Sequence, residues 1–459
     1  MRSSVFIAAI LFCGLAPVLA KDKLVLLQAA WRHGARSPTD SFPKDEYKES
    51  DWHLGWGQLT AEGMEQHVKL GTHLRERYLI NKTEFDFDMD PTFKSSHQLY
   101  VRATDVNRTI ISAMSNMIGF YDMVNTAKNG TDYPSIDAWP TGFVPIAIHN
   151  TVPYDLDHVG NPDADCQLYG DLWDAIHASE VYVNASENNA KLLDKLTNYT
   201  GMKVTLDNLW IVSDDLFIQN DTNRAWPDWV TEDLYKQIHE LNNQVQEWQN
   251  GVGLQNLTVH GQKVGTLVKQ TRGGSLVWSM LNHMQQKKQC LTGQNGKEKK
   301  CRWMNDLRYF VYSAHDTTLD ALLTALGSVR EVLKNGTYDG EYPHYSAAVT
   351  MELLQSDDSK YYVRANYWHP RQNYARIVFT KYIQGCETIK DDKCPLETML
   401  SSLQFLQPPK GETIESVTEP QQSFYLFSST ARRESLSSRN PRIPPSPPAL
   451  LRPAWPSSR

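Results

Sequence analysis

The sequence predicts an α/β fold, and three observations lead to this prediction. The continuous apolar run from Leu24 to Ala30 (LVLLQAA) is typical of a strand that is buried on both faces of a sheet. Strand-like and helix-like segments then alternate along the chain, as they do in sheets with crossover helices. The 459 residues exceed the usual size of a single core, so we expect two domains or one large, elaborated α/β domain.

Residue patterns place the individual elements. Apolar spacing predicts a helix from Thr60 to Ile80, with Thr60 as its N-cap. Gln98 to Arg102 is typical of a short strand, and a helix capped by Asp105 should follow it up to Tyr121. Three more strands and one helix are expected further along, in the ranges Leu307 to Ser313, Ala348 to Leu354, Tyr361 to Tyr367 and Thr317 to Leu326.

Composition divides the chain into four parts. Residues 1–20 have the positive start, short apolar stretch and small terminal residues of a secretory signal peptide. Residues 21–140 and 266–407 carry the α/β pattern and form the expected core. Residues 141–265 are richer in Asn, Asp and Trp and predict an inserted helical cap domain, with one helix from Glu232 to Gln249. Residues 408–459 are rich in Pro, Ser and Arg and should be a disordered tail.

Charge and targeting signals predict an exported protein. The net charge of −7 offers no basic surface for non-specific nucleic-acid binding, so no nucleic-acid partner is expected. After the leader no apolar run is long enough to span a bilayer, so no membrane anchor is expected. Asn-x-Ser/Thr triplets support passage through a glycosylating compartment. Asn107 opens an expected helix and is the weakest acceptor; the others are Asn81, Asn129, Asn184, Asn198, Asn220, Asn256 and Asn335. We expect a secreted or lumenal protein, extracellular or lysosomal.

The cysteines fit an oxidising compartment. Cys13 leaves with the leader, and five cysteines remain. Short-loop disulfides are expected for two pairs that are close in sequence, with Cys166 left over, although spacing alone does not fix the connectivity. The pairs are Cys290 with Cys301 and Cys386 with Cys394. No Cys-x-x-Cys spacing supports a zinc site, and we expect neither a metal nor a cofactor.

The segment Arg32-His33-Gly34-Ala35-Arg36-Ser37-Pro38 directly follows the first apolar run. Ligand sites in open α/β sheets lie at the carboxyl ends of strands. Guanidinium groups bind phosphate oxygens in pairs, and a glycine lets the backbone approach a ligand closely. A neutral imidazole beside a charge-neutralised phosphoryl group is a competent nucleophile. This segment therefore predicts attack by His33 on phosphorus, with Arg32 and Arg36 binding the phosphate.

Two other expected strand ends supply further groups. Arg102 would add a third cation, and His315 would donate a hydrogen bond to a phosphate oxygen. Asp316 would protonate the leaving oxygen, which requires a raised pKa or an acidic medium. Such a site needs no metal, because the arginines supply the positive charge. Each of these short motifs is common in unrelated proteins, and only their combination indicates a phosphoryl-transfer site.

Motifs of other catalytic classes are absent from the sequence. It contains no Gly-x-Ser-x-Gly elbow of an α/β hydrolase and no His-Glu-x-x-His pair of a zinc protease. It also contains no P-loop of the Gly-x-x-x-x-Gly-Lys-Ser/Thr type.

The segments RHGARSP and YSAHDTT resemble the histidine acid phosphatase family, the part of histidine phosphatase superfamily branch 2 that includes prostatic and lysosomal acid phosphatases. Pro38 to His67, Leu99 to Thr109, Gly273 to Met284 and the region around Cys386 and Cys394 are also similar to segments of animal members. The resemblance implies a phosphoglycerate-mutase-like three-layer α/β/α sandwich with a smaller, mostly helical inserted domain.

The resemblance also implies roles for single residues. His33 would be the phosphoryl acceptor and Asp316 the proton donor, while the phosphate ligands would be Arg32, Arg36, Arg102 and His315. Family members hydrolyse phosphate monoesters at acidic pH without a metal, and many form dimers, so a homodimer is a further expectation.

We therefore expect an acid phosphatase that acts on a small phosphomonoester or a phosphoprotein. A phytase-like or narrower phosphomonoesterase on the same site is the alternative, and a phosphoglycerate mutase is disfavoured because its substrates are cytosolic. A catalytically silent surface glycoprotein on the same fold is a third hypothesis. It would need a lost nucleophile or acid, yet His33 and Asp316 are both present.

Overall fold

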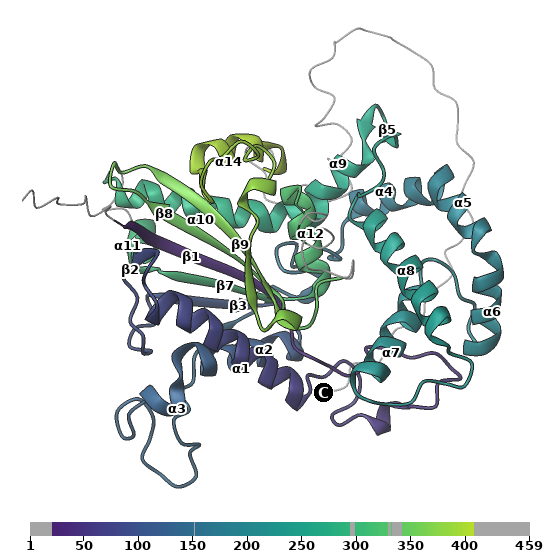
Figure 1. Ribbon diagram of the computed structural model, residues 1–459, viewed down its shortest axis with the longest axis horizontal. Helices are drawn as coiled ribbons and strands as arrows, with labels where there is room; N and C mark the ends of the chain where they lie inside the picture. Colours follow the sequence, from purple (N-terminus) through teal and green to yellow (C-terminus); the bar gives the residue numbers. More distant parts are fainter. Residues whose placement is uncertain (1–20, 151, 294–298, 329–331, 333–341, 408–459) are drawn as a thin grey trace, which may run out of the picture. The chain divides into compact units, whose positions relative to one another are not determined.

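The computed structural model describes residues 21–150, 152–293, 299–328, 332 and 342–407 (Figure 1). The expected signal peptide, the acceptor Asn335 and the expected tail lie outside these residues. Within the described part of the chain, no helix has the length and hydropathy needed to cross a membrane.

A mixed sheet lies at the centre of the fold. Its strands are β1 (Asp22–Arg32), β2 (Phe85–Phe87), β3 (Leu99–Ala103), β4 (Ile148–His149), β7 (Tyr309–Ala314), β8 (Ala348–Gln355), β9 (Tyr361–His369), β10 (Ala375–Val378) and β11 (Cys394–Pro395). The order is β10-β9-β8-β1-β7-β3-β4, with β2 beside β1 and β11 beside β9. The expected parallel arrangement is present in β1, β7, β3 and β4, whereas β8, β9 and β10 add an antiparallel half.

Helices cover both faces of this sheet and give the three layers that the resemblance implies (Figure 1). The helices of one face are α10 (Ser275–Leu291), α12 (Asp316–Leu326) and α14 (Leu396–Ser402). The helices of the other face are α1 (Ala61–Arg75) and α2 (Asn107–Tyr121). Because side chains alternate along a strand, β1 contributes Leu26 and Ala30 to one core and Leu27 and Trp31 to the other.

The segment expected to form the cap contains a third apolar cluster. It involves α4 (Gln167–His177), α6 (Ala190–Thr200), α7 (Leu209–Asp221), α8 (Glu232–Gln249) and α9 (Val264–Lys269). Phe42 from the loop after β1 joins this cluster. The strand β4, which we had placed in the cap, pairs instead with β3 in the sheet. The division into core and cap domains stays a prediction.

Short elements connect these parts. They are α3 (Met123–Thr126), α5 (Glu180–Asn188), α11 (Lys299–Asp306), the hairpin of β5 (Thr258–Val259) and β6 (Gln262–Lys263), and two π-helical turns, η2 (Glu76–Ile80) and η4 (Gln270–Gly274).

The helix starts test two expected caps. Thr60 is the N-cap of α1, and its side chain accepts a hydrogen bond from the N–H of Gly63, as predicted. Asp105 does not cap α2. The N-cap is Val106, and the Asp105 carboxylate instead accepts a hydrogen bond from the Asn150 amide at 2.5 Å. Asp105 lies one residue too early, because the strand before it extends to Ala103.

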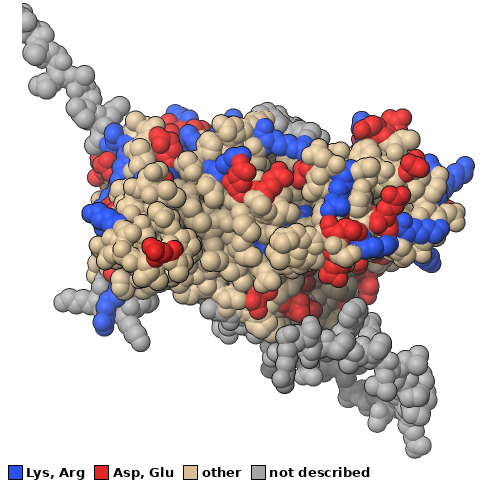
Figure 2. Space-filling view, turned by 90° about the horizontal axis from the view of Figure 1, so that it is seen from below, with Lys and Arg blue, Asp and Glu red and all other residues tan. Residues whose placement is uncertain are grey.

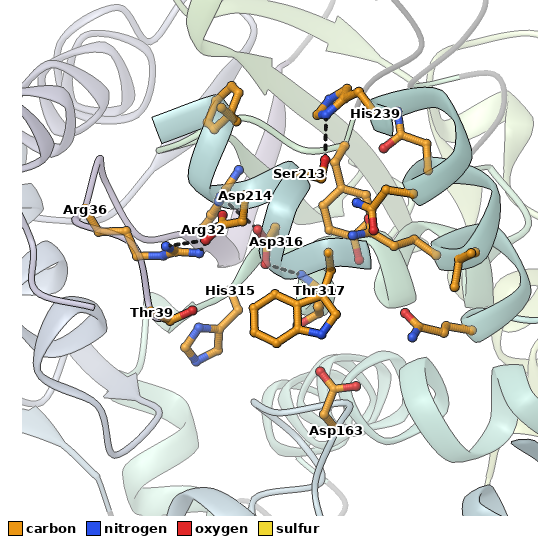
Figure 3. A pocket seen from close by; sticks show the side chains of 18 of the residues that line it. Arg32, Arg36, Thr39, Asp163, Ser213, Asp214, His239, His315, Asp316 and Thr317 are labelled. Carbon is orange, nitrogen blue, oxygen red and sulfur yellow. Dashed lines mark hydrogen bonds and ion pairs between the residues drawn. The ribbon is translucent and has the colours of Figure 1, made fainter. Parts of the chain in front are cut away.

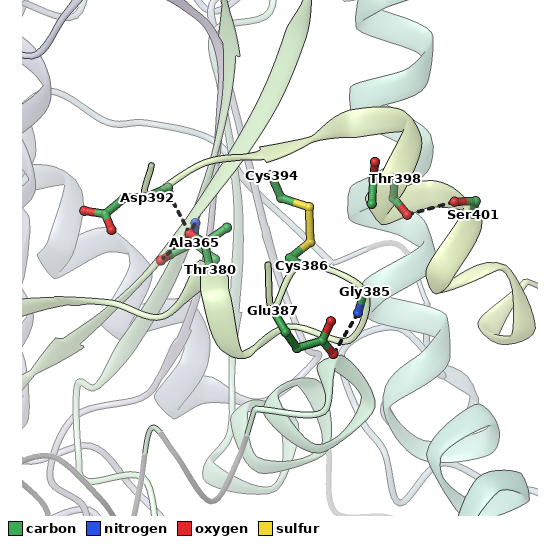
Figure 4. The surroundings of a disulfide bond; sticks show 9 residues. All are labelled: Ala365, Thr380, Gly385, Cys386, Glu387, Asp392, Cys394, Thr398 and Ser401. Atoms are coloured by element: carbon green, nitrogen blue, oxygen red, sulfur yellow. Dashed lines mark hydrogen bonds between the residues drawn. A yellow bond between two sulfur atoms is a disulfide. The ribbon is translucent and has the colours of Figure 1, made fainter. Parts of the chain in front are cut away.

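Both expected disulfides are present. Cys290 at the end of α10 is bonded to Cys301 in α11, so this pair joins two helices. Cys386 is bonded to Cys394 and ties β11 to the preceding loop (Figure 4). Cys166 is unpaired among the described residues, and its Sγ accepts a hydrogen bond from the Tyr169 N–H at the start of α4.

The surface is mixed in charge. Acidic and basic side chains are interspersed on the face shown in Figure 2. The seven Asn-x-Ser/Thr acceptors within the described residues are all exposed: Asn81, Asn107, Asn129, Asn184, Asn198, Asn220 and Asn256. Each of these side chains is accessible to modification, and their occupancy stays a prediction.

Candidate active site

Sheet register brings three chain segments to one edge. β1 and β7 are parallel, with Arg32 beside Ala314, and β3 and β7 are parallel, with Ala103 beside Ser313. The residues that follow these strands therefore converge, as expected at the carboxyl ends of parallel strands. A cavity of about 400 Å³ opens there (Figure 3). Of the six site residues predicted from the sequence, five line it: Arg32, His33, Arg36, His315 and Asp316.

His33 is buried and its imidazole is oriented by the backbone. Its Nδ1 lies 2.8 Å from the carbonyl oxygen of Gly34, which can only accept a hydrogen bond. Nδ1 therefore carries the proton, and Nε2 keeps its lone pair. Burial, followed by the charges of Arg108, Arg32 and Arg36, holds the pKa of His33 well below its ordinary value. Both effects favour the neutral imidazole, which is the state that a nucleophile needs.

The loop after β1 fits closely against the first turn of α1. A Cβ on Gly34 would lie 2.2 Å from the carbonyl oxygen of Gly63. The loop is also held by hydrogen bonds from Gly34 N to Ser112 Oγ and from Ala35 N to Gln66 Oε1. Any larger residue at position 34 would clash with the backbone of Gly63, so glycine allows the loop beside His33 to pack against α1.

Arg32 is fixed on three sides. Its Nη1 donates to the carbonyl oxygen of Pro343 at 2.7 Å, and its Nη2 lies 2.8 Å from Asp316 Oδ2. The guanidinium carbon lies 4.1 Å from the centre of the Tyr345 ring. These contacts preorganise the positive charge beside His33 before any ligand arrives.

Arg36 faces a carboxylate from the helical segment. Its two terminal nitrogens each lie 3.0 Å from an oxygen of Asp214 on α7, in the bidentate arrangement that guanidinium groups also offer to phosphate (Figure 3). Burial alone would lower the pKa of Arg36, but Asp214 outweighs it and raises that pKa. Sequence reasoning missed Asp214, because no motif marks it and α7 lies far away in the sequence.

Arg102 does not reach the cavity, contrary to prediction. It forms an ion pair with buried Asp157, whose Oδ1 also accepts the N–H groups of Val159 and Gly160. Arg102 thus anchors the loop around residue 157. It lies within β3 rather than beyond its end, so it belongs to the sheet and not to the cluster of residues above it.

Arg108 supplies the third cation instead. It lies in the first turn of α2, lines the cavity, and has Nη2 at 3.5 Å from His315 Nδ1. Burial, together with the neighbouring charge of Arg36, lowers the pKa of Arg108 to about 10, so it stays protonated. No ion pair of Arg108 is found among the described residues, and its buried Nε has no hydrogen-bond partner there. Its charge is therefore available to an anion.

His315 and Asp316 begin α12. His315 Nε2 lies 2.8 Å from Thr104 Oγ1, and the His315 ring centre lies 5.6 Å from that of His33. Burial and the charge of Arg108 lower the pKa of His315 to about 3, so it too is neutral. Asp316 accepts a hydrogen bond from the Thr317 N–H at 2.8 Å.

The Asp316 carboxyl is subject to opposing effects. Burial alone would raise its pKa, but the charges of Arg32 and Arg36 outweigh burial and lower it. The arginine charges therefore favour the ionised carboxylate of Asp316 at mildly acidic pH. A bound phosphate dianion would offset the arginine charges, and the pKa of Asp316 would then rise toward the value that a proton donor needs.

Sequence comparisons show which family the chain belongs to. The profile of the Histidine phosphatase superfamily (branch 2) matches residues 23–367. The chain belongs to this family. Lysosomal acid phosphatase of Xenopus laevis is 30% identical over 401 residues, which cover 86% of this chain and 79% of that protein. Human prostatic acid phosphatase is 30% identical over 385 residues, covering 83% and 84% of the two chains.

Solved structures share the fold of this histidine phosphatase at low sequence identity. The Citrobacter braakii phytase matches with a TM-score of 0.57 and 16% identity, covering 86% of this chain and all of the phytase. The Hafnia alvei phytase in complex with tartrate also matches with a TM-score of 0.57, at 14% identity. At such identities the match establishes the α/β architecture and leaves substrate specificity to the lining of the cavity.

A sequence signal for Arg108 did exist. It lies in Asp105-Val-Asn-Arg108-Thr, directly after a strand and in the first turn of the next helix. First-turn residues of such helices point toward the ligand-binding edge of the sheet. Choosing between Arg102 and Arg108 required the end of β3 to be known to within one residue, which sequence patterns do not provide.

Proposed function

We propose that this chain is an acid phosphatase that hydrolyses phosphate monoesters through a phosphohistidine intermediate. The observation that carries the proposal is a neutral His33 with a free Nε2 lone pair, placed among Arg32, Arg36 and Arg108. The relatives named lysosomal and prostatic acid phosphatases support the reaction class.

In the first step, the substrate phosphate binds to the arginines and its phosphorus lies in line with His33 Nε2. The Nε2 lone pair forms the P–N bond while the P–O bond to the leaving group breaks. Asp316 donates its proton to the departing oxygen, so the alcohol leaves neutral. The imidazole acquires positive charge as it is phosphorylated, and the dianionic phosphoryl group compensates that charge.

In the second step, water attacks the phosphorus from the side that the alcohol has left. The Asp316 carboxylate accepts a proton from this water, the P–N bond breaks, and neutral His33 is restored with release of phosphate. His315 and Arg108 contact the non-bridging oxygens in both steps. The arginines stabilise the charge that spreads over those oxygens in the transition state.

We further propose that the protein acts outside the cytosol, in a secreted or lumenal location. The two disulfides, the exposed Asn-x-Ser/Thr sites and the leader-like first 20 residues support this location. An acidic lumen would also favour the protonated state of Asp316 that the first step needs.

The test is phosphate release from 4-nitrophenyl phosphate between pH 4 and 8 by the glycosylated, disulfide-bonded protein. We expect activity on the acidic side and its loss in His33→Ala, with the folded state of the variant checked by circular dichroism. Full activity in His33→Ala would remove the nucleophile assignment. No activity in folded wild-type protein would favour the silent surface glycoprotein.

A further inference from the structure

Two carboxylates lie against two of the three arginines that line the cavity, and they come from different helices. Asp316, in the first turn of α12, contacts Arg32 with one oxygen at 2.8 Å. Asp214, in α7, contacts Arg36 with both oxygens at 3.0 Å (Figure 3). Arg108 has no ion pair in the described part of the chain. The proposed chemistry gives a role to Asp316 and leaves Asp214 without one.

Asp214 occupies the part of Arg36 that a phosphate would use. Each terminal nitrogen of a guanidinium group carries two N–H groups. Nη1 of Arg36 donates to the Ser37 carbonyl oxygen at 3.1 Å and to Asp214, and Nη2 donates to the other oxygen of Asp214. One N–H of Nη2 is left over, because the Nε of Arg36 is inaccessible to solvent. A phosphate therefore gains a second hydrogen bond from Arg36 only by displacing an oxygen of Asp214.

The charges of this cluster predict that a proton is taken up with the phosphate. The three guanidinium groups and the two carboxylates give a net charge of +1, because burial favours the neutral forms of His33 and His315. A dianionic phosphate would change this to −1, and an uncompensated charge in a buried cavity is costly. Proton uptake by one carboxyl group restores neutrality. A proton on Asp214 would break a bidentate ion pair, whereas a proton on Asp316 breaks a single contact, so Asp316 takes it up.

Other titratable groups surround the two carboxylates. Asp215, next to Asp214 on α7, and Asp45 lie 2.9 and 2.7 Å from the same hydroxyl oxygen of Ser41. Burial and the charge of Asp45 raise the pKa of Asp215, so this pair carries at most one charge at acidic pH. The groups that act on Asp214 or Asp316, or respond to them, besides Arg32 and Arg36, are His315, Arg108, Tyr154, Asp320, Tyr342 and Tyr345. They are all kept when Asp214 alone is replaced.

We infer that Asp214 is an internal counter-ion of the phosphate site: its carboxylate competes with the substrate phosphate for Arg36, and its negative charge makes Asp316 take up a proton as the phosphate binds. This inference rests on the proposed function, in which Asp316 donates that proton to the leaving oxygen. Asp214 thus weakens phosphate binding and keeps Asp316 protonated over a wider pH range. It is a positioning residue, since it acts through Arg36 and Asp316.

The first test measures the binding of sulfate at pH 5 by calorimetry. Sulfate is a tetrahedral dianion that does not titrate near this pH, so any proton taken up on binding goes to the protein. Titrations in two buffers of different ionisation enthalpy give both the affinity and the number of protons taken up. We expect Asp214→Asn to bind sulfate about tenfold more tightly than wild type, and to take up about half as many protons or fewer.

Two variants serve as controls. Asp207→Asn removes a carboxylate charge from another residue that lines the cavity, but Asp207 pairs with His177 at 2.8 Å and with none of the three arginines. Its sulfate affinity should stay within about threefold of that of wild type. Asp316→Asn should lose most of the proton uptake, which identifies Asp316 as the group that is protonated.

The second test compares turnover of glycerol 2-phosphate, an alkyl ester whose leaving group needs a proton. Removal of the Asp214 charge should lower the pKa of Asp316 in the complex, so the fall of kcat with rising pH should begin at a lower pH in Asp214→Asn. The KM at pH 5 should decrease about tenfold. If Asp214 merely held Arg36 in place, KM would instead increase and the pH profile of kcat would not move.

The outcomes separate this inference from the proposed function. Sulfate binding by Asp214→Asn that is no tighter than in wild type, an unchanged proton uptake or an unmoved pH profile would overturn the inference. The same gain in affinity in Asp207→Asn, or wild-type proton uptake in Asp316→Asn, would overturn it as well. If folded wild-type protein does not hydrolyse 4-nitrophenyl phosphate, the proposed function fails, and the sulfate titrations alone decide the inference.

Discussion

Replacement of Arg108 by lysine gives the sharpest prediction about the site, because sequence reasoning favoured Arg102. Arg108 is half-buried, lines the cavity and makes no ion pair among the described residues. Lysine keeps the charge and loses the planar fork that binds two phosphate oxygens. A hydrogen bond to a charged group contributes about 1.5–3 kcal/mol. Loss of one of the two guanidinium–phosphate hydrogen bonds should therefore lower kcat/KM about 10- to 100-fold.

Arg108 also affects the protonation of His33. After burial, the charge of Arg108 is the largest cause of the lowered pKa of His33. Arg108→Ala should therefore let that pKa rise, so that protonation of His33 reduces kcat/KM on the acidic side of the profile. Loss of both phosphate contacts should also cost about 10²- to 10⁴-fold in kcat/KM.

The assay is steady-state hydrolysis of 4-nitrophenyl phosphate from pH 4 to 8, with Arg102→Lys as the matched control. Arg102→Lys keeps a cation beside buried Asp157 and lies outside the cavity, so its kcat/KM should stay within about threefold of wild type. If Arg102→Lys lost as much as Arg108→Lys, or if Arg108→Lys kept wild-type kcat/KM, our assignment of the third phosphate ligand would be wrong.

Three further predictions concern packing and pH. Gly34→Ala would place its Cβ 2.2 Å from the carbonyl oxygen of Gly63, so refolding curves should show about 1–3 kcal/mol of lost stability and assays a loss of activity of about 10²-fold. Asp316→Asn should slow hydrolysis of alkyl phosphates about 10²- to 10⁴-fold but that of 4-nitrophenyl phosphate less, because the better leaving group needs less protonation. The variant should also lack the fall of kcat that we expect in wild type as rising pH deprotonates Asp316, and equal losses on both esters would argue against a proton donor. Burial lowers the pKa of His67 to about 3, so protonation of His67 favours the unfolded state. The free energy of unfolding should therefore fall as the pH drops from about 6.5 toward 3, by at most about 1.4 kcal/mol per pH unit. His67→Gln should make the urea midpoint less sensitive to pH over this window, and an unchanged pH dependence would show that His67 titrates normally.

The fold could be predicted from the sequence wherever local pattern and tertiary packing agree. The apolar run from Leu24 to Ala30 lies within β1, and the predicted helix from Glu232 to Gln249 has the observed bounds of α8. The antiparallel half of the sheet could not be predicted, because strand direction depends on the path of the intervening chain. The strand β4 was missed for a related reason: its two residues carry no periodicity and are defined by pairing with β3.

The candidate site could be predicted where one motif follows one strand. The segment from Arg32 to Arg36 and the His315-Asp316 pair all line the cavity as expected. The partners from the helical segment could not be predicted, because which face of α7 or α8 turns toward the sheet is decided by packing across the molecule. The carboxylate of Asp214, which faces Arg36, was therefore found only in the structure.

The most direct measurement of the proposed mechanism is the identification of the phosphorylated residue. Wild-type protein and Asp316→Asn are mixed with 4-nitrophenyl phosphate at pH 5, quenched in alkali within milliseconds, and mapped by peptide mass spectrometry. We expect up to about one phosphoryl group per chain on His33, with more of it retained in Asp316→Asn because water is activated more slowly. Phosphate on another residue, or normal turnover with an unmodified His33 at every quench time, would contradict the central claim.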